Sequence, residues 1–355
     1  MSTPDPMAST YPSAPRAISK ETHCIAGILT TVYGLQELPE ETREVACLWL
    51  LHPRLQTQAC MEPIASSTIH EWNERQRATK RTDRTIGLIA VSFDQRNHGT
   101  REVDTLANEA WRSGNSRHAQ DMFASYHGTA IDTSHLLTYL PSYIPLNITQ
   151  HLVLGISLGG HAAWHCLLHD PRITTAIIII GCPDYVRLMS DRARLSRLPT
   201  WTQSTPPGSQ FLGSKDFPNA LIDAVEKYDP AGLLLGDVKS RSSDIYNHTP
   251  NALERRSLIP LLKTHLQNKR ILNLAGGSDK LVPYKCSEPF LRWLKAATAP
   301  ISGWFKDGNV ILEDMVFEGV GHEMSAGMVK EVHRFVCQTL DQSSRPVLGR
   351  KSSKI

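Results

Sequence analysis

Features typical of membrane, nucleic-acid-binding and nucleotide-binding proteins are missing from this sequence. Its hydrophobic runs are far shorter than the roughly 20 residues that a membrane helix needs, so no membrane span is expected. Lys and Arg residues are scattered and the formal net charge is only +3, which argues against a nucleic-acid partner. Neither a GxxxxGKS or GxxxxGKT loop nor a GxGxxG loop is present, and we expect no cofactor.

The cysteines also lack the pattern of a disulfide or metal framework. They are odd in number, no pair has CxxC spacing, and several lie in hydrophobic runs. This usage predicts buried, reduced thiols in an intracellular protein. The seven positions are Cys24, Cys47, Cys60, Cys166, Cys182, Cys286 and Cys337.

Both ends of the chain are polar. Residues 1–18 are rich in Ser, Thr and Pro, lack the pattern of a secretory signal, and are expected to form a disordered leader. Residues 343–355 are expected to form a basic, flexible tail that ends in Ser353-Lys354-Ile355. This tripeptide differs by one apolar residue from the peroxisomal address Ser-Lys-Leu, so the expected location is cytoplasmic or peroxisomal. The alternative is a disordered tail that ends this way by chance.

Strand-like and helix-like segments alternate along the chain. Hydrophobic runs predict strands, and apolar residues at helical spacing predict helices between them. This alternation predicts the α/β class, with a mostly parallel sheet flanked by helices, over residues 19–182 and 266–342. The expected strands are Thr22–Tyr33, Val45–Leu51, Ile86–Phe93, His151–Ile156, Ala176–Ile180, Ile271–Ala275 and Val310–Phe317, and the expected helices are 56–79, 117–140, Leu158–His169 and Glu323–Leu340.

Residues 183–265 interrupt the alternation. The segment is too long for a simple crossover between strands and contains several short helical stretches. We predict an inserted helical cap over the site; the alternative is a separate small domain. Four aromatic residues of the segment are candidates either for lining an apolar pocket or for packing the cap itself: Trp201, Phe211, Phe217 and Tyr228.

The pentapeptide Gly155-Ile156-Ser157-Leu158-Gly159 has the GxSxG pattern. A hydrophobic strand precedes it and a helix-compatible run follows it, which is the setting of a nucleophile elbow. Such a turn exposes the Ser hydroxyl, and its glycines avoid collisions across the turn. The Leu158 amide, at the helix start, is a candidate oxyanion donor.

The chain resembles the α/β-hydrolase family over roughly residues 20–340. The elbow carries the resemblance together with the loop Asp94-Gln95-Arg96-Asn97-His98-Gly99 and the two segments described next. The Asp-x-Arg-x-His-Gly loop is mainly structural in that family, so neither Asp94 nor His98 is assigned to catalysis.

A Ser hydroxyl needs a base to activate it, and the base needs an orienting group. In this family the chain order is Ser, acid, His. Asp279 is the candidate acid, because it follows a strand and a small-residue turn and precedes a Val-Pro helix start. Asp184 is the second candidate, and the alternative for Asp279 is a helix-capping role. His322 is the candidate base, because it lies between the last strand and the last helix.

The second oxyanion donor is expected in the loop from His52 to Leu55. Many family members have His-Gly at this point, but here Pro53 follows the His and has no amide hydrogen. The Arg54 amide is therefore the candidate donor, with that of Leu55 behind it. Alternatively, the Arg54 side chain meets an anionic group of the substrate.

Three histidines, His161, His165 and His169, share one helix face at a spacing that zinc ligands can have. No carboxylate motif completes such a site, and no metal is expected. The resemblance and the site residues together predict a serine hydrolase that cleaves a carboxylic ester or thioester of a small-molecule acyl substrate through an acyl-enzyme. The alternatives are an acyltransferase, lyase or cyclase with the same site, and a ligand-binding protein with little turnover.

Overall fold

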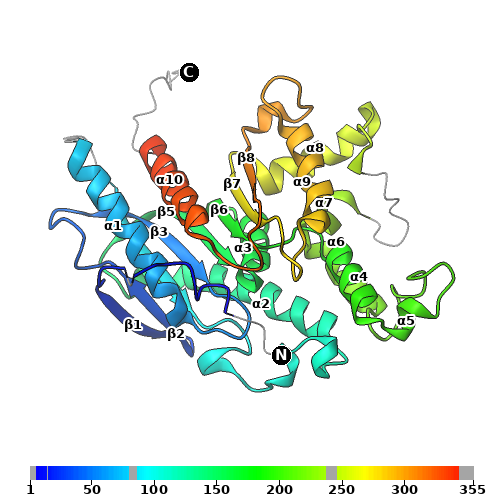
Figure 1. Ribbon diagram of the computed structural model, residues 1–355. Helices are drawn as coiled ribbons and strands as arrows, with labels where there is room; N and C mark the ends of the chain where they lie inside the picture. Colours follow the sequence, from blue (N-terminus) through cyan, green and yellow to red (C-terminus); the bar gives the residue numbers. More distant parts are fainter. Residues whose placement is uncertain (1–4, 14, 80–85, 237–245, 344–355) are drawn as a thin grey trace.

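The computed structural model describes residues 5–13, 15–79, 86–236 and 246–343. Eight strands form one sheet in the order β1-β2-β4-β3-β5-β6-β7-β8, and every neighbouring pair from β4 to β8 is parallel (Figure 1). The predicted α/β class is therefore confirmed. The strands are β1 Lys20–Ile25, β2 Ile28–Tyr33, β3 Glu44–Leu51, β4 Gly87–Phe93, β5 Asn147–Ile156, β6 Ile173–Ile179, β7 Arg270–Gly276 and β8 Ile311–Phe317.

The first predicted strand is in fact a hairpin. Ala26 and Gly27 both have positive φ, 50° and 81°, and turn the chain back within two residues. Turns of this kind match the twist of two antiparallel strands. The expectation of one strand over Thr22–Tyr33 was wrong because apolar residues lie on both sides of the turn and hide it in the sequence.

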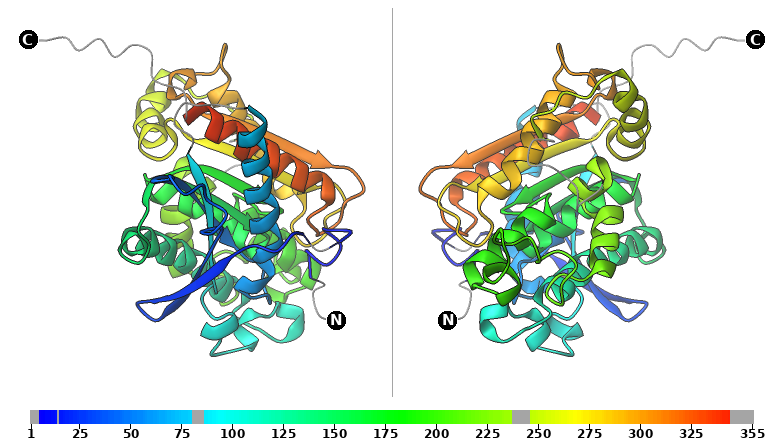
Figure 2. Two further views of the ribbon diagram at one scale, coloured as in Figure 1. Left: turned by 90° about the vertical axis from the view of Figure 1, so that its left-hand side faces the viewer. Right: turned by 90° about the vertical axis from the view of Figure 1, so that its right-hand side faces the viewer.

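Helices cover both faces of the sheet, as Figure 2 shows. The helices α1 and α10 pack on one face, and α2, α3 and α9 pack on the other. Along β3, Trp49 faces the second group and Leu48 the first, which explains why this strand is hydrophobic throughout. The helices are α1 Glu62–Thr79, α2 His118–Tyr139, α3 Leu158–His169, α4 Tyr185–Ser196, α5 Pro199–Thr202, α6 Asn219–Tyr228, α7 Pro230–Leu235, α8 Ala252–Leu266, α9 Tyr284–Thr298 and α10 Ala326–Ser343, with short 3-10 turns at Gln58–Met61, Gly99–Arg101, Leu106–Asn108, Trp111–Ser113, Leu140–Ser142 and Lys306–Gly308.

The predicted cap segment contains α4 to α8, and these helices contact different parts of the molecule. Residues of α4 line the cavity at the active site, whereas α7 and α8 contact α3 on the face of the sheet that α2, α3 and α9 cover. Phe211 packs between Trp201 and Phe217, with its ring centroid 6.0 and 5.5 Å from theirs. These three residues therefore pack the segment itself, whereas the fourth candidate, Tyr228, packs on His127 of α2 with ring centroids 4.1 Å apart.

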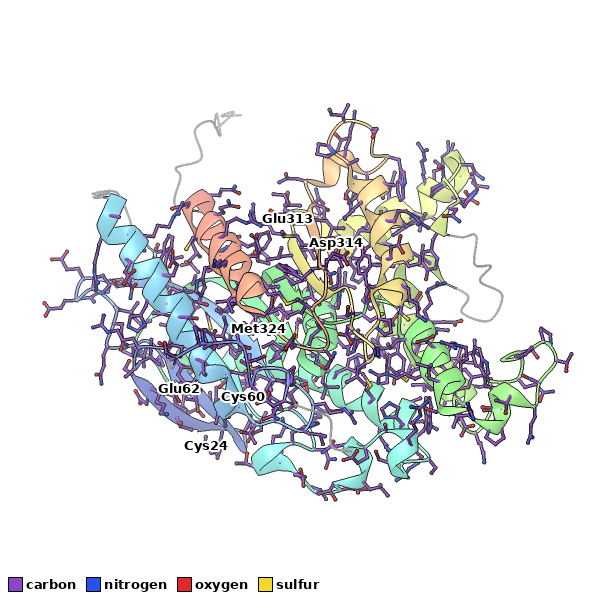
Figure 3. All side chains as sticks on the ribbon, viewed as in Figure 1. Cys24, Cys60, Glu62, Glu313, Asp314 and Met324 are labelled. Atoms are coloured by element: carbon purple, nitrogen blue, oxygen red, sulfur yellow. The ribbon has the colours of Figure 1, made fainter. Side chains whose placement is uncertain are left out.

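The leader differs from its expected disorder over residues 5–13. Met324 donates its amide hydrogen to the Pro6 carbonyl at 2.8 Å, and Thr10 donates its hydroxyl hydrogen to the Met324 carbonyl at 2.8 Å. Met7 and Thr10 are buried. The stretch runs from the beginning of α10, near the Met324 label in Figure 3, toward α1. Polar composition misled the prediction, because backbone and hydroxyl hydrogen bonds hold this segment.

The seven cysteines are unpaired, as predicted, and five of them are buried. Figure 3 labels Cys24, which is exposed, and Cys60, which is partly buried. Within the described residues, no helix combines the length and apolar character that a membrane crossing requires. The predicted targeting tripeptide at 353–355 lies outside the described residues.

Candidate active site

The site is built on the turn between β5 and α3. Ser157 occupies this turn with φ 55° and ψ −111°, a backbone conformation that side-chain-bearing residues rarely adopt. A Cβ on Gly155 would overlap the Gly159 carbonyl, and a Cβ on Gly159 would overlap the Leu51 carbonyl. The two glycines therefore permit a sharp turn that also lies directly against the end of β3.

Three predicted side chains meet at this turn. The Ser157 hydroxyl lies 2.8 Å from His322 Nε2, and His322 Nδ1 lies 2.8 Å from Asp279 Oδ2. The other Asp279 oxygen accepts hydrogen bonds from the Leu281 and Val282 amides at 2.8 and 2.9 Å. The carboxylate is thus fixed by its own loop on one side and faces the imidazole on the other.

The environment of Asp279 favours its ionised form. Burial alone would raise the pKa of this carboxyl, but the hydrogen bond and charge of His322 and the two amides together lower the pKa below its ordinary value. The group is therefore an anion at neutral pH. An anion at Nδ1 keeps a proton on that nitrogen, which leaves the Nε2 lone pair directed at Ser157.

Backbone hydrogen bonds join the loops that carry Asp279 and His322. Gly277 donates to the Phe317 carbonyl and Ser278 donates to the Val320 carbonyl, both at 2.9 Å. A Cβ on Gly276 would overlap the Gly321 carbonyl, so the loops also touch there. These contacts continue the β7–β8 pairing and set the distance between acid and imidazole.

Asp314, labelled in Figure 3, lies on β8 and links this strand to β7 and α9. Its carboxylate accepts hydrogen bonds from Asn273 on β7 at 2.8 Å and from Tyr284 and Lys295 on α9 at 2.7 and 2.9 Å. The Lys295 ion pair is shielded on the acid side, because only 1% of the Asp314 side chain is exposed. The helix that follows the Asp279 loop is thereby attached to the sheet.

The loop after β3 lies beside the elbow. His52 Nε2 accepts the Gln95 amide hydrogen at 2.9 Å, so Nδ1 carries the proton and donates to the Pro53 carbonyl at 2.8 Å. Burial is the main cause that lowers the pKa of His52 to about 4, and the ring is neutral. The ring and its two hydrogen bonds fix the path of the chain up to Arg54. The Leu158 amide is the first of α3 and has no acceptor within its own helix.

A cavity of about 140 Å³ lies at Ser157 and His322. Its walls come from separate parts of the chain. Several of these parts were expected at the site from the sequence: the elbow, the 52–55 loop, the loops that carry Asp279 and His322, and the cap. The leader and the 99–117 segment were missed, since neither has a periodic pattern. The lining residues are Pro6, Pro53, Arg54, Ala110, Trp111, Arg112, His118, Met122, Ser157, Leu158, Arg192, Leu195, Ser196, Lys280, Leu281 and His322.

Comparisons with known proteins agree with this architecture. No protein-family model and no curated protein matches the sequence. TT1662 from Thermus thermophilus is similar in structure, with a TM-score of 0.53 and 16% identity over 92% of this chain and 99% of that chain. The chain has the α/β-hydrolase fold. An acylaminoacyl peptidase from Pyrococcus horikoshii is also similar in structure, with a TM-score of 0.49 and 11% identity over 94% of this chain and 43% of that chain. The α/β hydrolase GrgF from Penicillium has a TM-score of 0.46 and 15% identity over 92% of this chain and 99% of that chain.

In this α/β-hydrolase fold the second acid candidate forms hydrogen bonds that position α4. Asp184 caps the N-terminus of α4, where it accepts the Arg187 amide hydrogen at 3.0 Å, and it also accepts the Tyr246 hydroxyl. The Asp94 carboxylate of the Asp-x-Arg-x-His-Gly loop accepts hydrogen bonds from the Gln58 amide and from Thr100. Both carboxylates therefore hold backbone in place.

The three histidines of α3 have protein partners. His161 Nδ1 contacts the Cys182 backbone at 3.1 Å, His165 Nδ1 lies 3.2 Å from His127 Nδ1, and His169 Nε2 lies 2.8 Å from the Tyr228 carbonyl. Burial is the main cause that lowers the pKa of each ring. Across the described ranges, no group of three or more His, Cys, Asp or Glu residues could hold a metal ion.

Proposed function

We propose that this protein is a serine hydrolase that cleaves a carboxylic ester or thioester through an acyl-enzyme. The observation that carries the proposal is the continuous hydrogen-bonded chain from Ser157 through His322 to Asp279, open to a cavity at the Ser157 end. A hydroxyl, a base and a buried anion in this order supply the groups that acyl transfer to serine requires.

In the first half of the reaction, Ser157 Oγ attacks the acyl carbon while His322 Nε2 takes the hydroxyl proton. The carbonyl π electrons move to oxygen, giving a tetrahedral oxyanion and an imidazolium. Asp279 stabilises the imidazolium through its hydrogen bond to Nδ1. Collapse of the oxyanion expels the alcohol or thiol, which receives the proton from Nε2, and leaves the acyl group esterified to Ser157.

In the second half, His322 removes a proton from water as the water oxygen attacks the acyl-enzyme. The second oxyanion then collapses, the carboxylic acid leaves, and Ser157 Oγ recovers its proton from Nε2. No cofactor takes part in either half, because the imidazole both accepts and returns each proton.

Two backbone amides are proposed for the oxyanion hole. The Leu158 N–H is free of helical pairing, and Leu158 lines the cavity beside Ser157. Arg54 lines the same cavity from the 52–55 loop, and Pro53 before it has no N–H to give. Two fixed donors at this point would stabilise the negative charge that develops on the carbonyl oxygen as Ser157 attacks and that the bound ester lacks.

Steady-state hydrolysis of para-nitrophenyl esters of graded chain length, beside acyl-CoA thioesters, tests the proposal. We expect release of acid and leaving group in equal amounts, with a pre-steady-state burst of one leaving group per enzyme if deacylation is the slower step. Ser157→Ala is the matched control and should abolish turnover. A wild-type enzyme that turns over no ester or thioester would leave a ligand-binding role, and acyl transfer to added alcohol in preference to water would indicate an acyltransferase.

A further inference from the structure

Cationic side chains surround the cavity at Ser157. Four of its lining residues are Lys or Arg, and none of the described lining residues is Asp or Glu. They come from separate parts of the chain, so the positive charge is not the face of one helix. The four are Arg54, Arg112, Arg192 and Lys280.

Arg192, on α4, is held in place by three acceptors. Its guanidinium donates to His118 Nε2, to Met122 Sδ and to the Leu281 carbonyl, all at 3.1 Å. All three acceptors are neutral; for His118, burial first and then the charges of Arg192 and Arg54 hold its pKa well below the usual value. The Arg192 charge is therefore positioned by hydrogen bonds without being neutralised by them.

These contacts leave Arg192 able to bind another group. A guanidinium has more N–H donors than three acceptors occupy, and it fits carboxylate and phosphate oxygens in a two-pronged geometry. Burial lowers the pKa of Arg192 overall, although Asp279 is among the groups that raise it, so burial makes the charged guanidinium costly. A bound anion would offset that cost.

Arg54 adds a second positive charge on the same cavity. Burial first, and then repulsion from Arg192, lower the pKa of Arg54 to about 10, which places the two guanidinium groups within electrostatic reach of each other. The Arg54 side chain also donates to the Asn108 carbonyl, so it too has a fixed direction. Two like charges in one partly buried cavity repel, and a shared anion converts the repulsion into attraction.

We propose that Arg192, with Arg54 beside it, binds an anionic oxygen group of the substrate, a carboxylate or phosphate, close to the bond that Ser157 cleaves. The inference rests on the proposed hydrolase function and names its substrate class: acyl compounds that carry a negative charge near the scissile carbonyl. Arg192 acts as a specificity residue and takes no part in bond making. The positive charge of the described lining residues favours this class over cationic substrates.

Two pairs of esters test the proposal and distinguish the side that carries the charge. In the first pair, para-nitrophenyl hydrogen succinate has a carboxylate in its acyl part, and its methyl ester has a neutral group at the same place. In the second pair, para-butanoyloxybenzoate has the carboxylate in its leaving group, and its methyl ester has a neutral group there. The readout is the ratio of kcat/KM for the anionic over the neutral member of each pair, measured at low salt.

We expect the wild-type ratio to exceed unity by about 10- to 100-fold in one of the two pairs, as for one hydrogen bond to a charged group. Arg192→Met should remove most of that preference, and Arg192→Lys should retain part of it. Arg194→Met is the matched control, because Arg194 lies on the same helix, pairs with Asp191 and does not line the cavity. Its ratio should equal that of the wild type.

Each contrary outcome has a distinct meaning. Turnover with ratios near unity in both pairs, or a preference that Arg192→Met leaves intact, overturns the anion site while the hydrolase proposal stands. Failure of every ester together with failure of Ser157 to label covalently overturns the proposed function itself. If Arg192→Met does not fold, Arg192→Lys and the loss of preference at high salt give the same decision, since screening weakens an ionic contact.

Discussion

Replacing Asp279 with Asn is the sharpest perturbation of the proposed site. The Asn carbonyl can still accept the Leu281 and Val282 amide hydrogens, so the loop should keep its path. Its NH₂ group then faces His322 Nδ1 and can only donate. The imidazole would hold its proton on Nε2, where it points at Ser157 and cannot accept the hydroxyl proton.

The expected loss follows from two effects at the 2.8 Å contact between Asp279 and His322. Removing a hydrogen bond to a charged group costs about 1.5 to 3 kcal/mol, or roughly 10- to 100-fold in rate. The wrong tautomer adds to this, and the same change in a Ser-His-Asp site elsewhere lowers kcat by about 10⁴-fold. We therefore expect a fall in kcat of about 10³- to 10⁴-fold.

The assay is steady-state hydrolysis of a para-nitrophenyl ester, with Asp184→Asn as the matched control. Asp184 is also a buried carboxylate, but it caps α4 and contacts Tyr246. An Asn at this position can still cap α4 through its side-chain carbonyl oxygen, so the helix should keep its start and kcat should stay within about threefold of wild type. A mild effect of Asp279→Asn beside a severe effect of Asp184→Asn would instead make Asp184 the catalytic acid.

Two further predictions concern the framework of the site and its stability. Gly159→Ala should abolish activity and lower the yield of folded protein, because its Cβ would overlap the Leu51 carbonyl; near-wild-type melting and turnover would contradict this close contact at the elbow. Asp170→Asn should lower the free energy of unfolding by about 1 kcal/mol at pH 7, a value reduced for the exposure of its partner Arg172. Burial would raise the pKa of Asp170, but hydrogen bonds from Arg172 and Ser134 lower it overall, so this stabilisation is present above the ordinary carboxyl pKa and is lost as pH falls through the depressed value. Urea unfolding at a series of pH values should show the gap to wild type closing on acidification, and a gap that widens would be contrary evidence.

Much of the framework could be predicted from the sequence because local signals and tertiary structure agree there. The helix expected at Leu158–His169 has the observed bounds, since a strand, two glycines and an apolar run all indicate the same turn. Asp279 and His322 could be placed together because parallel strands end at the same edge of the sheet.

Some walls of the cavity could not be predicted in this way. Trp111 and Arg112 lie in a segment without periodicity, and Pro6 lies in a polar leader, so their positions depend on contacts between distant parts of the chain. Arg192 was missed for another reason. A cation on an amphipathic helix usually faces solvent, and only the fold brings this one beside His118 and Leu281.

Covalent labelling with a fluorophosphonate probes Ser157 as the nucleophile without any knowledge of the substrate. We predict one adduct per chain on the peptide that contains Ser157, no adduct in Ser157→Ala, and much slower labelling in His322→Ala. A wild-type enzyme that does not react, or a Ser157→Ala variant that labels as fast as wild type, would show that Ser157 is not the activated nucleophile.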